Sequence, residues 1–122
     1  MSLLKPLDEG FPIERQLGIE AAPVVLVNLF TLDAKDEQAF LDAWTADAAF
    51  MKRQPGFIAT QLHRAIGASP TYLNYAVWES TEVFRAAFSH PEFVAKLSAY
   101  PSSAVASPHL FQKVAVPGIC TA

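Results

Sequence analysis

The chain has 122 residues, of which 52% are hydrophobic and 17% charged, and its net charge is −3. This composition predicts one domain with a single apolar core and excludes a disordered chain. The acidic balance argues against nucleic-acid binding, which needs a basic face. No apolar run reaches the roughly 18 residues of a membrane span, and no signal peptide is evident, so we expect no membrane partner. The lone cysteine, Cys120, cannot form an internal disulfide, which favours a cytoplasmic protein.

The first 22 residues show no clean periodicity and are interrupted by glycine and proline. We predict an extended N-terminal tail over 1–22, a folded domain over 23–117 and a C-terminal tail over 118–122. The first strand of that domain is predicted over 23–31, where an apolar run indicates burial on both faces. Asn28 interrupts this run on the face of Leu26, so it either bonds local backbone or points into a cavity.

A helix is predicted to begin at Asp33, a good N-cap, and to end before Pro55 and Gly56. Acidic residues in its first turn match the helix dipole. Its apolar stripe, which recurs at helical spacing, comprises Phe40, Leu41, Trp44, Ala48 and Met51.

Two strands are predicted over 57–66 and 71–78. The short turn between them indicates that they form an antiparallel hairpin. Side chains alternate across a strand, so the hairpin has two kinds of face. On the strand over 71–78, one face carries an amide and an indole among otherwise apolar side chains. The residues of this face are Tyr72, Asn74, Ala76 and Trp78. Because buried polar groups need partners, we interpret this face as the wall of a cavity. The opposite face is apolar and comprises Leu73, Tyr75 and Val77.

Ser80 is predicted to cap a second helix, and Pro91 suits the first position of a further short helix. Residues 101–108 have a loop-like composition, and a last strand is predicted over 109–116. His63 is the one histidine within a predicted strand. No second ligand stands near it at metal-binding spacing, so we predict no metal site.

The element order predicts an α+β, ferredoxin-like β-α-β-β-α-β domain, a four-stranded antiparallel sheet with helices on one face. The other sheet face would then expose apolar residues, which is typical of an interface. The simplest cover is a second copy of the chain in a two-fold homodimer.

Several motifs in this order resemble those of the antibiotic biosynthesis monooxygenase family, across about residues 23–116. They are VLVNLFT at 25–31, FLDAW at 40–44, QPGF at 54–57, LHR at 62–64, NYAVWES at 74–80, FRA at 84–86 and PEF at 91–93. The resemblance implies a dimeric α+β barrel in which two sheets face each other. It also implies a cavity in each subunit between the sheet and the helices.

Some members of that family oxidise aromatic polyketides, converting anthrones to quinones with O₂ and no cofactor. Asn74 and Trp78 match the spacing of the cavity residues proposed there, and their N–H groups could stabilise an oxyanion. Neither side chain accepts a proton at neutral pH, so His63 or His90 is the candidate acceptor. We expect further contacts with a small aromatic substrate from Asn28, Trp44, Tyr72, Phe84, Phe88 and His90.

The resemblance leaves two alternatives open. Haem-degrading relatives use an asparagine and a tryptophan at positions that Asn28 and Trp78 match, with a histidine on the next helix as iron ligand. Here His90 comes after that helix, so haem ranks second. The other alternative is a dimer that binds a small ligand without catalysis.

Overall fold

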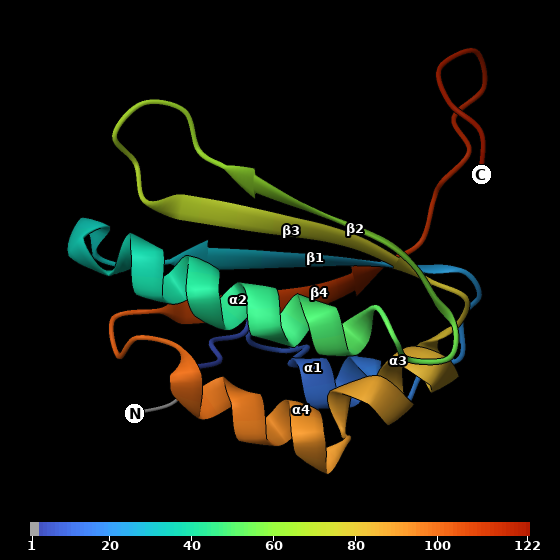
Figure 1. Ribbon diagram of the computed structural model, residues 1–122. Helices are drawn as coiled ribbons and strands as arrows, with labels where there is room; N and C mark the ends of the chain where they lie inside the picture. Colours follow the sequence, from blue (N-terminus) through green and yellow to red (C-terminus); the bar gives the residue numbers. More distant parts are fainter. Residues whose placement is uncertain (1–2) are drawn as a thin grey trace.

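The computed structural model describes residues 3–122 and shows a four-stranded antiparallel sheet with strand order β2-β3-β1-β4 (Figure 1). The strands are β1 Val24–Thr31, β2 Phe57–Arg64, β3 Thr71–Trp78 and β4 Val105–Phe111. The α-helices are α1 Ile13–Gln16, α2 Glu37–Met51, α3 Thr81–Phe88 and α4 Pro91–Lys96, with single 3₁₀ turns η1 Ala34–Asp36 and η2 Leu97–Ala99. The helices lie on one side of the sheet, which confirms the predicted α+β architecture (Figure 1). No helix among residues 3–122 is both long and apolar enough to cross a membrane.

The sheet face toward the helices is the one predicted to carry the amide and the indole. Tyr72, Ala76 and Trp78 are all buried there. They pack in two adjoining clusters, one around Phe40 and Tyr72 beneath α2, the other around Trp78 and Phe84 beneath α3. Burying large aromatic side chains of this kind is the main source of stability in a small domain.

No helix among residues 3–122 covers the opposite sheet face (Figure 1). Tyr75 at its centre is 40% exposed, and the neighbouring apolar side chains of Val27, Leu73 and Val77 are half-buried. Residues paired across strands share a face, so Val27 and Tyr75 lie side by side on this surface. We call this surface the open sheet face.

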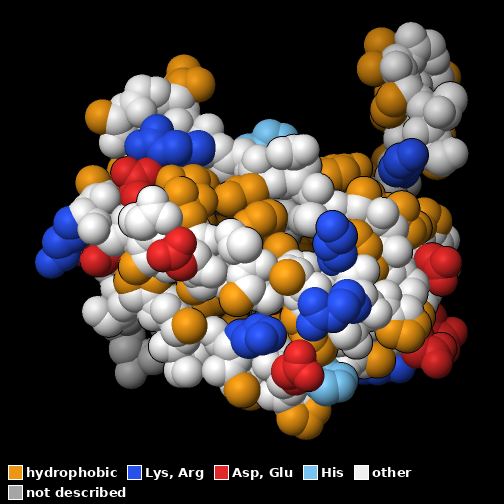
Figure 2. Space-filling model, in the orientation of Figure 1, with side chains coloured by type: hydrophobic (Ala, Val, Ile, Leu, Met, Phe, Trp, Pro, Cys, Tyr) orange, Lys and Arg blue, Asp and Glu red, His pale blue; other side chains and the backbone are white. Residues whose placement is uncertain are grey.

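The last strand begins four residues earlier than predicted: β4 spans Val105–Phe111, and the predicted loop over 101–108 is wrong in its second half. Small residues such as Ala104 and Ala106 are buried against the core, although their composition resembled a loop. Pro108 fits within the strand because β4 lies at the sheet edge, where a missing N–H is tolerated. The residues after Phe111 project away from the helical layer (Figures 1 and 2).

The segment before β1, predicted as an extended tail, contains the one-turn helix α1. Gln16 is 5% exposed; its side-chain amide donates to the Phe11 carbonyl at 2.7 Å and accepts from the Leu110 N–H at 2.7 Å. The bond from Leu110 joins the segment to the edge strand β4. Residues 1 and 2 of the predicted tail lie outside the described residues.

Two of the three predicted helix starts follow their local signals, whereas the Asp33 side chain forms no cap bond and α2 begins at Glu37, after η1. The Ser80 hydroxyl accepts from the Val83 N–H, as a cap should, and Pro91 opens α4 as predicted. On α2, however, the fully buried positions are Phe40, Ala43 and Phe50, and the other four residues of the predicted stripe are half-buried, namely Leu41, Trp44, Ala48 and Met51. The stripe is displaced because one side of α2 borders a cavity rather than solid core.

Gly56 gives a test of how α2 is joined to β2. Its φ of +85° is left-handed, and a Cβ at this position would overlap the Val83 side chain on α3. We expect Gly56→Ala to lower the free energy of unfolding by about 2–4 kcal/mol, measured by urea denaturation. Gly67→Ala is the matched control, because Gly67 also has a left-handed φ, of +70°, but a Cβ there would meet open space. We expect this control to lower the free energy of unfolding by only about 1–2 kcal/mol. Equal costs for the two variants would show that the contact with Val83 is unimportant.

Candidate functional site

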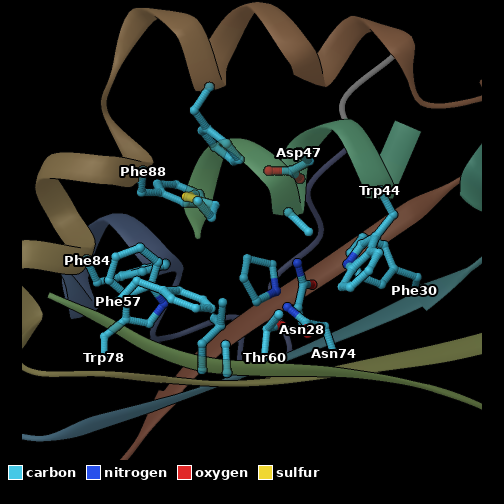
Figure 3. Close-up of a pocket in the computed structure, with 16 residues that line it drawn as sticks. Asn28, Phe30, Trp44, Asp47, Phe57, Thr60, Asn74, Trp78, Phe84 and Phe88 are labelled. Atoms are coloured by element: carbon cyan, nitrogen blue, oxygen red, sulfur yellow. Dashed lines mark hydrogen bonds between the residues drawn. The ribbon is translucent and has the colours of Figure 1, made fainter. Parts of the chain in front are cut away.

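A cavity of about 50 Å³ lies between the sheet and the helices (Figure 3). Its sheet side is formed by β1, β2, β3 and β4, and its helix side by α2, α3 and α4. The lining residues are Leu26, Asn28, Phe30, Trp44, Asp47, Ala48, Met51, Phe57, Thr60, Asn74, Ala76, Trp78, Phe84, Phe88, Phe93 and Pro108. Most of them are apolar, and three of the polar ones lie together on the sheet side.

Both asparagines of the chain line this cavity. The register of β1 and β3 sets Asn28 directly opposite Asn74, so their side chains emerge next to each other on the same face. The structure therefore brings together two amides that are 46 positions apart in sequence. Alternation had placed Asn74 on a cavity wall, whereas Asn28 had been left open between a bond to local backbone and a cavity. Two carboxamides side by side can present donors and acceptors to one bound polar group.

The two amides differ in how they are held. The Thr60 hydroxyl donates to Asn74 Oδ1 at 2.5 Å, which occupies the acceptor of Asn74 and leaves its N–H groups available. By contrast, Asn28 Oδ1 is buried and has no hydrogen-bond partner among the described residues. Since buried polar atoms are nearly always paired, this oxygen is suited to accept a hydrogen bond from a ligand.

Aromatic rings form the far end of the cavity. Trp78 is 1% exposed and meets Phe57 and Phe84 edge-to-face, with ring centroids 5.4 and 5.5 Å apart. Phe88 continues this wall toward Phe93, at 5.2 Å between centroids. These contacts hold Trp78 rigidly, and they give the cavity flat apolar surfaces suited to an aromatic ligand.

A bulge in β2 brings Phe57 to the cavity. The register shifts between Phe57 and Ala59, so Phe57 pairs with Trp78 and faces the helices, whereas Ile58 is 53% exposed. Strict alternation along β2 would instead place Phe57 on the face of Ala59, Gln61 and His63. Beyond the bulge, Thr60 pairs with Ala76 and shares its face.

Asp47 on α2 is the ionisable lining residue that the sequence analysis missed. It lies three positions after Trp44 and four before Met51, so it falls on the predicted apolar stripe. A carboxylate on such a stripe was the signal that could have revealed it. The Tyr100 hydroxyl donates to Asp47 Oδ2 at 2.7 Å. Burial raises the pKa of Asp47 to about 6, against the lowering effects of this hydrogen bond and of the Lys96 charge.

Of the nine residues predicted for the site, six line the cavity: Asn28, Trp44, Asn74, Trp78, Phe84 and Phe88. Their chemical roles stay predictions. The other three, Tyr72, His63 and His90, are held elsewhere by their own hydrogen bonds.

His63 pairs with Leu73, so it lies on the open sheet face, where its ring nitrogen contacts the Leu73 carbonyl at 3.3 Å. The predicted role of His63 as proton acceptor is therefore wrong for a cavity on the other side of the sheet. His90 is exposed and caps α4, accepting from the Glu92 N–H at 3.1 Å. It does not reach the cavity either.

Tyr72 is buried on the predicted face but lies beyond the cavity. Its hydroxyl donates to Glu37 Oε1 at 2.6 Å, and Arg64 pairs with the same carboxylate at 2.8 Å. The bonds from Arg64 and Tyr72 lower the pKa of Glu37. Tyr72 thus fastens the start of α2 to the sheet and does not contact the predicted substrate site.

The lining residues do not fit haem. Haem iron in such a cavity needs an axial ligand, commonly an imidazole. No histidine among the described residues contributes to the cavity wall, and His90 is committed to the α4 cap. The haem alternative is therefore not supported.

An antiparallel sheet with its helices on one face, and a mostly apolar cavity between the layers, defines a ferredoxin-like α+β domain with an internal cavity. The chain belongs to the antibiotic biosynthesis monooxygenase family, whose sequence model matches residues 23–96. This confirms the family inferred from the ordered motifs.

Individual relatives agree with this assignment. The chain is 33% identical over 94 residues to deoxynogalonate monooxygenase from Streptomyces nogalater, covering 77% of this chain and 79% of that protein. The crystal structure of SnoaB, a cofactor-independent oxygenase from Streptomyces nogalater, superposes with a TM-score of 0.72 at 31% identity, covering 80% of this chain and 99% of SnoaB. A proposed monooxygenase from Shewanella loihica PV-4 gives a TM-score of 0.68 at 30% identity, covering 81% of this chain and 100% of that one.

The burial of Asp47 has a consequence for stability. In the folded chain the Asp47 carboxyl group keeps its proton up to about pH 6, whereas in the unfolded chain it loses that proton near pH 3.8. The folded state therefore binds more protons between these values, and stability falls as the pH rises through that window. An amide at this position would carry no charge, so we expect Asp47→Asn to be more stable than wild type by about 1–3 kcal/mol at pH 7.5 and equally stable near pH 3.5.

Urea denaturation at a series of pH values measures this difference. Asp42→Asn is the control, because Asp42 is an exposed carboxylate on the same helix, bonded to Gln38. Its substitution should change stability by less than about 0.5 kcal/mol. If Asp47→Asn were less stable than wild type at pH 7.5, the carboxylate would be a net stabilising group and our account of its burial would be wrong.

Proposed function

We propose that the protein is a cofactor-independent monooxygenase that oxidises an electron-rich, phenolic aromatic substrate of the anthrone type with O₂. The observation that carries this proposal is the pair of opposed amides, Asn28 and Asn74, in an otherwise apolar cavity. Membership of the family and similarity to SnoaB, a cofactor-independent oxygenase, support the same conclusion.

The chemistry needs little from the protein. A methylene group between two aromatic rings loses a proton, and the resulting enolate passes an electron to O₂ before the two radicals combine. Loss of water from the hydroperoxide then gives a ketone, so that R₂CH₂ + O₂ yields R₂C=O + H₂O. Because the substrate supplies all four electrons, no external reductant is required. The protein must stabilise the enolate oxygen and keep water away from it.

The polar groups of the cavity match these needs. Asn74, held by Thr60, offers N–H donors to the enolate oxygen. Asn28 Oδ1, which has no partner within the described chain, can accept from a neighbouring phenol hydroxyl of the substrate. Together the two amides suit a ligand that carries a carbonyl and a hydroxyl side by side, as hydroxylated anthrones do.

Binding a fused-ring substrate requires the cavity to widen. Its volume of about 50 Å³ is well below the roughly 300–1,000 Å³ of pockets for drug-sized ligands. The sheet side is fixed by strand pairing, so the movement must come from the helix side. Met51, Phe88 and Phe93 form part of that wall, and Met51 in particular is flexible enough to move aside.

Oxygen consumption with 1,8-dihydroxyanthrone tests the proposal, after subtraction of the rate without protein. We expect Asn74→Ala to lower kcat roughly 100-fold, because an oxyanion donor is lost from a dry site. Gln38→Ala removes an amide from the exposed face of α2 and should leave the rate unchanged.

Two results would contradict this function. The first is a wild-type rate no greater than that of buffer. The second is an Asn74→Ala variant as active as wild type. The ligand-binding alternative predicts a different pair of results. Wild type would consume no oxygen, and Asn74→Ala would bind the anthrone with unchanged affinity.

We propose further that two copies of the chain pack through the open sheet faces. The partly exposed Tyr75, flanked by Val27 and Val77, gives this surface an apolar centre that a two-fold partner would cover. The segment after β4 extends away from the helical layer (Figure 1), and its exposed apolar residues, which include Val114 and Ile119, could extend this contact.

Sedimentation velocity tests the proposed dimer. Tyr75→Glu would place two like charges in the interface. We therefore expect the dissociation constant of the dimer to rise roughly 100-fold or more. Thr45→Glu is the control, since Thr45 is exposed on α2 on the other side of the sheet. A wild-type chain that sediments as a monomer at micromolar concentration would disprove the dimer.

A further inference from the structure

Asp47 is the one ionisable side chain among the described residues that line the cavity. It extends from α2 and faces the sheet-side amides across the cavity (Figure 3). A ligand bound to Asn28 and Asn74 would therefore lie between these amides and a carboxylate. The function proposed above uses the amides but leaves this carboxylate without a role.

The position of Asp47 is fixed by Tyr100. The Tyr100 hydroxyl donates to Oδ2 at 2.7 Å and leaves Oδ1 for another contact. Tyr100 is 8% exposed, and its ring packs against Phe30 and Phe40 with centroids 6.0 and 5.8 Å away. A hydroxyl held in the core in this way gives the carboxyl group a defined orientation.

We propose that Asp47 is the proton acceptor of the oxygenation, taking the first proton from the methylene carbon of the bound substrate. This inference rests on the function proposed above. Tyr100 is the positioning residue that holds Asp47 in place. The substrate class that follows is narrower than phenols in general: it must carry an acidic C–H bond opposite the oxygen atoms that the amides bind.

The proton can be followed through the whole reaction. The C–H bond breaks, its electron pair stays on the substrate as an enolate, and Asp47 becomes a neutral acid. After O₂ adds, Asp47 returns the proton to the peroxide anion. Asp47 then removes the second C–H proton as the O–O bond breaks, and the departing hydroxide takes that proton and leaves as water. Asp47 ends as a carboxylate, ready for the next substrate.

The surroundings of Asp47 suit this role. Burial is the main cause that raises its pKa to about 6, so the carboxylate is a stronger base than an exposed one and is still ionised at neutral pH. The groups that act on it are the Tyr100 hydroxyl and the Lys96 ammonium, from the α4–η2 side. The sheet side presents neutral amides and the Thr60 hydroxyl, and no charge. The rate should therefore rise with pH through a midpoint near 6.

Hydrogen exchange without oxygen isolates the proton-transfer step. The protein is incubated anaerobically with 1,8-dihydroxyanthrone in D₂O, and deuterium at the methylene carbon is followed by mass spectrometry against a protein-free blank. We expect wild type to accelerate exchange and Asp47→Asn to lose at least about 100-fold of this acceleration. Asp42→Asn, which alters an exposed carboxylate on the same helix, should exchange like wild type.

The outcomes separate the two proposals. Exchange that wild type accelerates and Asp47→Asn does not, without oxygen uptake in air, would support Asp47 as the proton acceptor and overturn the oxygenase function. Oxygen uptake by Asp47→Asn within about threefold of wild type would overturn Asp47 and leave the function standing. Neither exchange nor uptake by wild type would overturn both.

Tyr100→Phe gives a second, independent test that does not remove the carboxylate. The hydrogen bond from Tyr100 lowers the pKa of Asp47, so its loss should move the midpoint of the pH–rate profile to higher pH. The rate on the alkaline plateau should stay within about threefold of wild type. A midpoint that stays in place, or that moves to lower pH, would show that Asp47 does not control the profile.

Discussion

The register between β1 and β3 is the constraint on which the site depends. It places Asn28 beside Asn74 and, at the other end of the pair, Val24 beside Trp78. A slip of β3 by one residue would turn Asn74 to the opposite face, away from Asn28, and bring Tyr75 toward the helices. Such a slip is opposed by the burial of Tyr72, Ala76 and Trp78 in the two core clusters. The chemistry of the cavity therefore depends on the same apolar contacts that fold the domain.

The helix side of the cavity is organised by a different kind of interaction. Asp47 and Tyr100 form a hydrogen-bonded pair in apolar surroundings, where an ionised carboxylate is disfavoured. The fold tolerates this cost at a place where a packed core would be more stable. Active sites often retain polar groups that lower the stability of the fold, because the chemistry needs them. The two sides of the cavity thus differ, with neutral amides on a rigid sheet and a basic carboxylate on a helix.

Local patterns in the sequence predicted most of the elements and part of the site. Alternation placed Tyr72, Asn74, Ala76 and Trp78 on one face correctly, because β3 is regular and central. Alternation failed for Phe57, since a bulge is set by the pairing with β3 and leaves no local signal.

Other features depend on contacts between distant residues. The beginning of β4 at Val105 is stabilised by its pairing with β1, which composition does not reveal. The pair of Asp47 and Tyr100 joins positions 53 apart. His63 shows the limit of residue type as a guide, because a histidine is a good proton acceptor only if the sheet turns it toward the substrate.

The sheet is a single layer with the cavity on one side and the open sheet face on the other. Val27 and Leu29 flank Asn28 in sequence, and Leu73 and Tyr75 flank Asn74, so each amide lies between two residues of the opposite surface. A mutation on these strands thus affects two surfaces at once, and the sheet side of the cavity should diverge slowly among related proteins. Met51, Phe88 and Phe93 on the helix side do not have this double role. New substrate preferences should therefore arise first through the helices, both in natural divergence and in directed evolution.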